Sequence, residues 1–177
     1  MNSNEKTFID LYEMHYDEVH AFCARRVGWD SAADATAEVF AVAWRRIDEV
    51  PADRSRAWLY GVARRVVGNS WRSSSRRNRL AARVAGQAPR RPEVPEAVVV
   101  QRSVDDEVLR ALAKLRTPDQ EILRLAAWEE LTGPEIAEVL GIGLNAAQQR
   151  LTRARRRLAK ALGTRVLARE ITQEQAS

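Results

Sequence analysis

Hydrophobic residues recur at intervals of three and four along most of the chain, which is the spacing that places side chains on one face of an α-helix. This period holds over residues 5–27, 31–47 and 56–77, and again in shorter stretches between residues 103 and 162. No run alternates as a strand would; Val98–Val100 is too short to count. The pattern therefore predicts an all-α protein.

Residues 84–102 lack a helical period and contain a cluster of prolines, Pro89, Pro92 and Pro95. Dense proline favours an extended chain without a packed core. We therefore predict two small helical domains, residues 1–83 and 103–163, joined by a Pro-rich linker. Residues 164–177 are expected to form a partly disordered tail that extends the preceding helix with fraying, the disorder lying at its end, residues 173–177.

Capping residues predict where several of the helices begin. Thr132 with Glu135 three residues later is a capping box, and Thr117 precedes a proline at the first helical position. Ser31 or Asp30 is expected to cap the helix that runs to about residue 47.

Residues 131–162 predict two helices joined by a tight turn at 141–143, where glycine can adopt a positive φ. The second helix carries an apolar stripe that we expect to face the core: Leu144, Ala147, Leu151, Ala154, Leu158 and Leu162. Its opposite face carries side chains able to bond base edges and phosphates: Asn145, Gln148, Gln149, Thr152, Arg153 and Arg156. This pattern is typical of a helix-turn-helix that enters the major groove, although a helical hairpin with a solvated face remains an alternative.

Charge is unevenly distributed along the chain. Residues 1–63 sum to −4, 64–83 to +7, 84–149 to −4 and 150–177 to +6. Two separate basic blocks on acidic supports indicate two contacts with one nucleic acid, with acidic surface left for a protein partner.

The first basic block, residues 64–83, begins within the third predicted helix, and Asn69 and Trp71 lie among its arginines. Cations beside an aromatic ring suit single-stranded or distorted nucleic acid, because bases stack on rings while guanidinium groups hold phosphate. A place in the core is the alternative for Trp71 and the preferred interpretation for Trp58.

Several functional classes lack support in the sequence. Cys23 is the only cysteine, so no internal disulfide can form, and His20 with Cys23 lacks the further ligands that a metal site needs. Asp34 and Glu38 share a helix face without any nucleophile or catalytic histidine pattern, so we expect no enzyme, no catalytic residue and no cofactor. No apolar run could span a bilayer and the N-terminus is polar, which predicts a cytoplasmic protein without membrane insertion.

Four segments together resemble a known family: LYEMHYDEVHAF, DATAEVFAVAWRRIDEV, RAWLYGVARRVVGNSWRSSSRR and ALAKLRTPDQEILRLAAWEELTGPEIAEVLGIGLNAAQQRLTRARRRLAKAL. In this order, the chain resembles bacterial RNA polymerase sigma factors of the extracytoplasmic-function (ECF) group, group 4 of the sigma-70 family. The resemblance implies sigma region 2 in residues 1–83 and sigma region 4 in residues 103–163.

The resemblance also implies roles for individual residues and partners. The β′ clamp of core RNA polymerase would receive Asp34, Glu38, Phe40, Trp44, Arg45 and Arg46. The promoter's −10 element would be read and opened by the loop at 48–55 with Arg64, Arg65, Asn69 and Arg72. The −35 element would be read by Asn145, Gln148, Gln149, Arg150, Thr152, Arg153 and Arg156. A further contact with the β flap and an inhibitory anti-sigma factor are implied by the family alone.

The sequence departs from the family at informative positions. Members often carry Gln at position 37, which is Ala here, and Asn where Arg65 stands. The usual Ser-Val-Gly-Thr-Val opening of the recognition helix is replaced by residues 143–147, so Asn145 and Gln148 could cap the helix instead of reading bases. The alternative function is an autonomous helix-turn-helix regulator that binds duplex DNA without polymerase.

Overall fold

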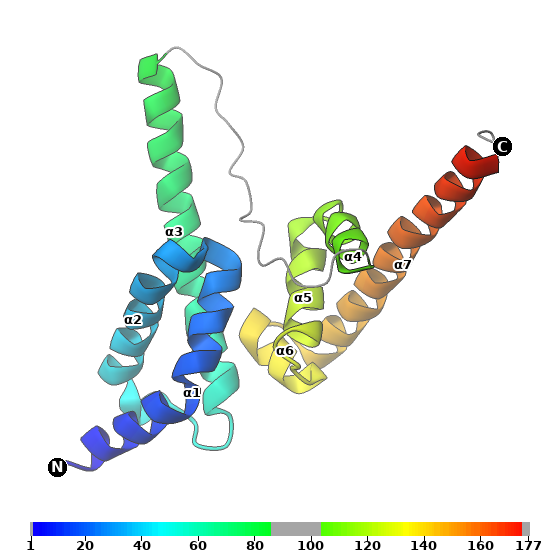
Figure 1. Ribbon diagram of the computed structural model, residues 1–177. Helices are drawn as coiled ribbons and strands as arrows, with labels where there is room; N and C mark the ends of the chain where they lie inside the picture. The colour runs from blue at the N-terminus through cyan, green and yellow to red at the C-terminus, as the bar shows by residue number, and fades with distance from the viewer. Residues whose placement is uncertain (1, 86–103, 175–177) are drawn as a thin grey trace. The chain divides into compact units, whose positions relative to one another are not determined.

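The computed structural model describes the main chain of residues 2–85 and 104–174, and the side chains of residues 2–70 and 106–163. Within these residues the chain is helical with no β-strand, which confirms the predicted all-α class (Figure 1). The chain divides into two compact units, unit 1 (Met1–Ala97) and unit 2 (Val98–Ser177). Most of the predicted linker, residues 86–102, lies outside the described residues.

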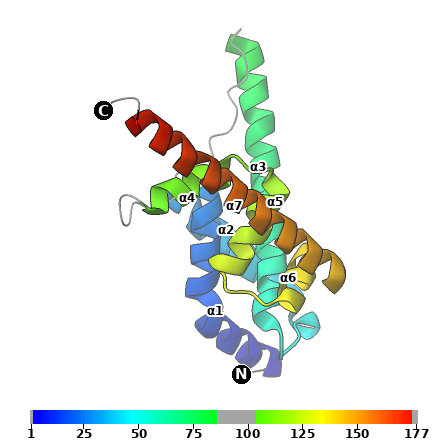
Figure 2. The same ribbon diagram turned by 90° about the vertical axis from the view of Figure 1, so that its right-hand side faces the viewer.

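Unit 1 consists of α1 (Ser3–Val27), α2 (Trp29–Arg45), the short 3-10 helix η1 (Ile47–Glu49) and α3 (Ser55–Ala85). The views in Figures 1 and 2 agree that the three long helices lie side by side. Their facing sides bury an apolar core that includes Val19, Phe22, Val39 and Leu59. Burial of these stripes supplies the main driving force for packing the three helices.

The starts of the first two helices differ from the prediction. Asn2 and Glu5 form a capping box for α1, in which Glu5 Oε2 accepts from the Asn2 amide at 2.8 Å. α2 begins directly after Gly28, whose φ of 82° lets the chain turn sharply out of α1. The predicted side-chain cap by Ser31 or Asp30 is wrong, because both residues lie inside the helix and no side-chain cap is present.

α3 continues past the predicted end at residue 77 to Ala85, so Val84 and Ala85 are helical instead of belonging to the linker. Residues 78–85 include alanine, leucine and arginine, which are good helix formers, and the next proline is Pro89. The basic block is therefore carried on a helix over its whole length.

Unit 2 consists of α4 (Val104–Ala113), α5 (Thr117–Ala127), α6 (Gly133–Leu140) and α7 (Leu144–Glu174). The three shorter helices pack along the N-terminal part of α7 (Figure 1). The core of this unit is lined by aliphatic side chains: Ala111, Leu112, Ile122, Leu125, Ile136, Val139, Ala147 and Ala154. α7 runs through Gly163 to Glu174, beyond the end predicted for the second domain.

The start of α5 is displaced by one residue from its predicted cap. Thr117 is the first helical residue and Arg116 occupies the cap position without a side-chain cap bond. Gln120 instead bonds the preceding segment: its Nε2 donates to the carbonyl of Leu115 at 2.8 Å and to that of Ala113 at 3.3 Å. It thereby satisfies carbonyl groups left without helical partners where α4 ends.

Candidate nucleic-acid interfaces

The turn between α6 and α7 has the geometry that its sequence predicts. Glu135 Oε2 accepts from the Thr132 amide at 2.8 Å and from its hydroxyl at 2.7 Å, which confirms the capping box. Gly141 adopts φ 64° and ψ 39°, and the amides of Gly141 and Ile142 donate to the carbonyls of Glu138 (3.1 Å) and Ala137 (3.0 Å). This is a Schellman motif, in which a left-handed residue ends the helix and satisfies its last carbonyls.

The opening of α7 settles how its first polar residues are used. The Ala147 amide donates to the Gly143 carbonyl at 3.0 Å, and Leu144 is the first helical residue. Asn145 is therefore inside the first turn, and the alternative in which it caps α7 is wrong. Asn145 and Gln148 are both exposed.

The polar face of α7 remains open to solvent within unit 2. The exposed side chains are Asn145, Gln148, Gln149, Thr152, Arg153 and Arg156, and Arg150 is half-buried. Amides, a hydroxyl and guanidinium groups supply both donors and acceptors for base edges, together with positive charge for phosphates. The face thus has the chemistry expected of a groove-reading helix.

The apolar stripe of α7 follows the prediction except at its N-terminal end. Ala147 and Ala154 are buried, and the leucines at 151, 158 and 162 are half-buried. Leu144, expected in the core, is instead 42% exposed. As the first residue of α7 it lies against the start of α6, where a Cβ on Gly133 would be 3.5 Å from Leu144 Cδ1.

An ion pair that sequence reasoning missed ties α7 to α5. Arg157 Nη1 donates to Asp119 Oδ2 at 2.6 Å, and Arg116 Nε lies 3.5 Å from the same oxygen. The Asp119 side chain is only 5% exposed. An acid just after the proline of a helix start was the available signal, because such a residue sits at the positive end of the helix dipole.

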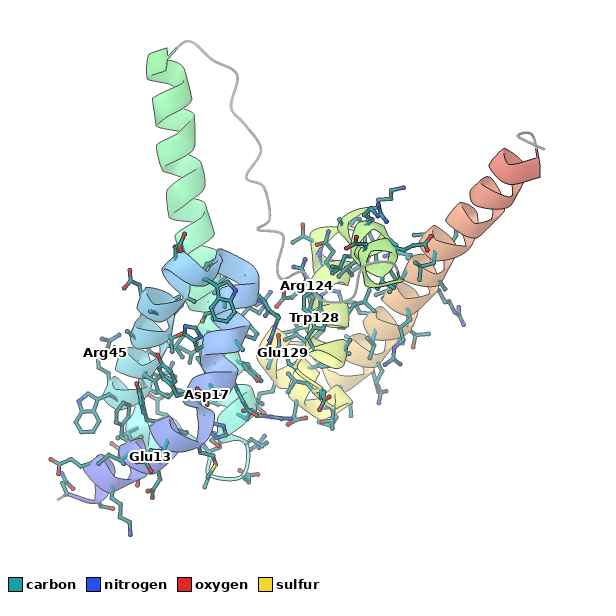
Figure 3. All side chains as sticks on the ribbon, viewed as in Figure 1. Glu13, Asp17, Arg45, Arg124, Trp128 and Glu129 are labelled. Atoms are coloured by element: carbon teal, nitrogen blue, oxygen red, sulfur yellow. The ribbon has the colours of Figure 1, made fainter. Side chains whose placement is uncertain are left out.

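A second polar cluster lies on α5 and just after its C-terminal end. The Arg124 guanidinium lies over the Trp128 ring, with its carbon 5.4 Å from the ring centroid, and Arg124 Nη2 donates to Gln120 Oε1 at 3.2 Å. Glu129, next to Trp128, is buried; Figure 3 labels the three residues of this cluster in unit 2. This cluster was also not predicted.

In unit 1 the basic block of α3 presents Arg64, Arg65 and Asn69 to solvent, while neighbouring Ala63, Val66 and Val67 are buried. The predicted side chains of Arg72 and Trp71 lie outside the described residues. Trp58 is half-buried beneath the Arg46 guanidinium, whose carbon is 5.5 Å from the ring centroid. This cation–π contact joins the end of α2 to α3.

The acidic pair on α2, Asp34 and Glu38, is exposed, as are Trp44 and Arg45 at the end of the same helix. Phe40 differs from the other predicted docking residues because it is only 3% exposed. Its ring packs against Phe8, Tyr12 and Tyr16, with centroid separations of 4.8–6.3 Å. Phe40 is therefore part of the aromatic packing between α1 and α2, beneath the exposed residues of α2.

Exposed charged residues also lie on α1 and α2. Figure 3 labels Glu13 and Asp17 on α1 and Arg45 on α2. Arg46 donates to Glu49 of η1, and this hydrogen bond together with the positive charge of Arg46 lowers the pKa of the Glu49 carboxyl. The pair fixes the end of α2 against η1.

The histidines have partners within unit 1. His15 is buried, its Nε2 lies 2.9 Å from Ser55 Oγ and its Nδ1 lies 3.3 Å from Glu18 Oε2. His20 lies between the rings of Tyr16 and Trp29, at 5.9 and 5.6 Å. His15 therefore links α1 to the first residue of α3, a role that the sequence pattern did not indicate.

In the part of the chain that the structure describes, no helix is long and apolar enough to cross a membrane.

Two family models match the chain in the order of the two units. The model described as "Sigma-70 region 2" matches residues 11–77, and that described as "Sigma-70, region 4" matches residues 105–158. The chain is 27% identical to "ECF RNA polymerase sigma factor SigW" of Bacillus subtilis (strain 168) over 169 residues, which cover 90% of each sequence.

Solved structures are similar over the same extent. CnrH, solved in complex with the cytosolic domain of CnrY, is 26% identical with a TM-score of 0.60, and the match covers 92% of this chain and 91% of that one. RpoE of Bartonella quintana, solved with the anti-sigma factor NepR, has a TM-score of 0.63 at 20% identity, covers 89% and 98%, and supports the fold alone. Both region models, their order and the full-length likeness show that the chain belongs to the sigma-70 family, as a sigma factor of the ECF type.

Proposed function

We propose that this sigma factor binds core RNA polymerase and directs it to promoters, reading the −35 element with unit 2 and reading and opening the −10 element with unit 1. The observation that carries the proposal is the exposed amide- and arginine-rich face of α7, presented by a helix-turn-helix of regular geometry. Region 2 function is assigned to residues 1–83, region 4 function to 103–163, and residues 84–102 connect them.

Duplex reading is assigned to the first four turns of α7. The N-terminal residues of a recognition helix meet base edges, whereas residues further along meet the backbone. We therefore assign base contacts to Asn145, Gln148 and Gln149, and assign Thr152, Arg153 and Arg156 to bases or phosphates as the groove turns away. Arg150 is half-buried and would reach a phosphate with its outer end.

Strand opening is assigned to α3 and the loop at 48–55. Arg64 and Arg65 offer positive charge on the exposed side of α3, and Asn69 lies one turn after Arg65. Arg72 continues this face by sequence spacing. Holding an unstacked base can offset the few kcal/mol that flipping costs, so opening requires binding and no catalysis by this chain. Bond formation belongs to the polymerase.

Polymerase docking is assigned to the exposed residues of α2. Asp34 and Glu38 form an acidic pair one turn apart, and Trp44 with Arg45 extends the surface toward its end. Charged rims of this kind set association rate and orientation, while an aromatic anchor supplies buried area. The partner surfaces would be the β′ clamp for unit 1 and the β flap for unit 2, in the cytoplasm where the polymerase acts.

An inhibitory protein partner is proposed by analogy with CnrH, which was solved in complex with the cytosolic domain of CnrY. The exposed rings of Trp29 and Trp44 on unit 1 offer apolar area for such a partner. Its identity would follow from proteins that copurify with this chain from its source cells and suppress transcription when added back.

The test is run-off transcription with purified core polymerase, this chain and a pool of promoter fragments from the source genome. We expect specific initiation that requires the chain, with start sites that share two upstream elements. Absence of polymerase binding, together with a footprint of the chain alone on a symmetric duplex site, would instead support the autonomous regulator.

A further inference from the structure

We propose that Leu144 is a specificity-determining residue that contacts the C5 methyl group of a thymine in the −35 element. This inference rests on the proposed function, since it requires α7 to lie in the major groove. It gives a role to the one member of the predicted apolar stripe that is exposed, since the others are buried or half-buried.

The position of Leu144 within the helix-turn-helix is the first argument. It is the first residue of α7 and follows the Gly141 turn that sets the direction of the helix. In helix-turn-helix proteins the N-terminal residues of the recognition helix approach base edges most closely. Its neighbours Asn145 and Gln148 are exposed polar residues, so an apolar group stands here among candidate base-reading side chains.

The Leu144 side chain also lies against the start of α6. Leu144 Cδ1 and Gln148 Cγ both approach Gly133 at the start of α6, at 3.5 and 3.8 Å from the place where a Cβ would lie. The two side chains, one turn apart on α7, therefore both lie beside the same glycine. A leucine held against a neighbouring helix presents its methyl groups at lower entropic cost than a mobile side chain would.

The chemistry of the groove selects the ligand. Among the base edges of the major groove, the thymine C5 methyl is the apolar feature, whereas the other groups are hydrogen-bond donors or acceptors. Gln148, beside Leu144, can bond the N6 and N7 of adenine. A leucine and a glutamine side by side therefore fit a site rich in A·T pairs better than one made only of G·C pairs.

The test uses deoxyuridine, which differs from thymine by the C5 methyl alone. Holoenzyme containing this chain is bound to its promoter, and each thymine of the −35 element on either strand is replaced singly. At one position we expect about fourfold weaker binding, which corresponds to about 0.8 kcal/mol for a buried methyl-sized group. Leu144→Ala should bind the thymine and deoxyuridine promoters equally.

The matched control is Leu109→Ala, which removes another exposed leucine of unit 2, on α4 (36% exposed). It should keep the discrimination of the wild-type chain. The inference is overturned if no replacement affects wild-type binding, if Leu144→Ala retains the sensitivity, or if the −35 element lacks A·T pairs. Failure of the proposed function would look different, because wild-type holoenzyme would then not bind or initiate on any promoter.

Discussion

Arg157 shows how one residue of a basic block can serve the fold instead of the ligand. It follows the exposed Arg155 and Arg156 on α7, but its guanidinium bonds the buried carboxylate of Asp119 on α5 at 2.6 Å. The charge of Asp119 is thereby compensated away from bulk water, and the pair joins α7 to α5.

We predict that Arg157→Ala lowers the free energy of unfolding of unit 2 by about 1.5–3 kcal/mol, the range for a lost hydrogen bond to a charged group. Urea unfolding of the full chain, followed by amide signals of α5 and α7, measures this effect. Arg155→Ala removes an exposed arginine nearby and should change stability by less than about 0.5 kcal/mol. Equal losses in the two variants would contradict a structural role specific to Arg157.

Glu49 provides a prediction on pH. The hydrogen bond and charge of Arg46 lower its pKa below the ordinary value of 4.5. Because the folded-state pKa is the lower one, ionised Glu49 contributes stability above the ordinary pKa, and this contribution is lost as the pH falls through the folded-state value. Titration of the Glu49 carboxyl by NMR should give a midpoint below 4.5, returning toward it in Arg46→Met. An unchanged midpoint in that variant would show that the pair does not form in solution.

At the scale of elements, the turn between α6 and α7 determines the direction of the recognition helix. Gly141 has a positive φ of 64°, a conformation that costs other residues about 1–2 kcal/mol. Gly143 lacks a positive φ and has open space around it. The two glycines of one turn therefore face different constraints.

We predict that Gly141→Ala destabilises unit 2 by about 1 kcal/mol or more, whereas Gly143→Ala changes its stability by less than about 0.5 kcal/mol, because the lower entropy of the unfolded chain offsets the weaker capping of α7 by alanine. Thermal unfolding of both variants beside the wild type measures the difference. Equal effects, or a larger loss in Gly143→Ala, would contradict the assigned turn geometry.

The helices were predictable because long stretches with a 3.6-residue apolar period leave little choice of structure. Two local signals, the Thr132 capping box and the Gly141 turn, also placed both ends of α6 correctly. Element ends were less predictable. Gly28 starts α2 through its backbone conformation, so the expected caps at Ser31 and Asp30 have no function there. Local patterns do not reveal when a turn's backbone replaces a side-chain cap.

At the scale of the whole molecule, polar residues could be assigned to surfaces from the sequence, but contacts between distant segments could not. Arg157 with Asp119 and His15 with Ser55 join residues 38 and 40 positions apart, and nothing in the local spacing indicates either. For the same reason, Phe40, expected on a docking surface, is buried, and Leu144, expected in the core, is exposed. Burial depends on which helices pack nearby, and a helical period fixes only the face.

The acidic face of α2 makes a prediction about assembly with polymerase. Asp34→Lys should weaken association with core polymerase by roughly tenfold at low salt and less at high salt, because exposed charges are screened by ions. Binding of labelled variants to core polymerase across a salt series measures this. Asp10→Lys makes the same charge change at an exposed site on α1 and should have a smaller effect. Similar losses for both would mean that net charge, and not the α2 face, controls association.

The two units are proposed to contact two separate promoter elements within one polymerase complex. Cys23 is the only cysteine and is completely buried, so a cysteine introduced on the surface can be labelled selectively. Exposed Ser70 on α3 and exposed Ala146 on α7 lie beside the proposed reading residues and differ little from cysteine in size. Each single variant, Ser70→Cys or Ala146→Cys, would carry a DNA-cleaving reagent.

The measurement is the position of DNA cleavage by each labelled variant on a promoter, with and without core polymerase. We predict cleavage at the −10 element from position 70 and at the −35 element from position 146, both dependent on polymerase. Cleavage by both variants at one common site, or an unchanged pattern without polymerase, would contradict the account.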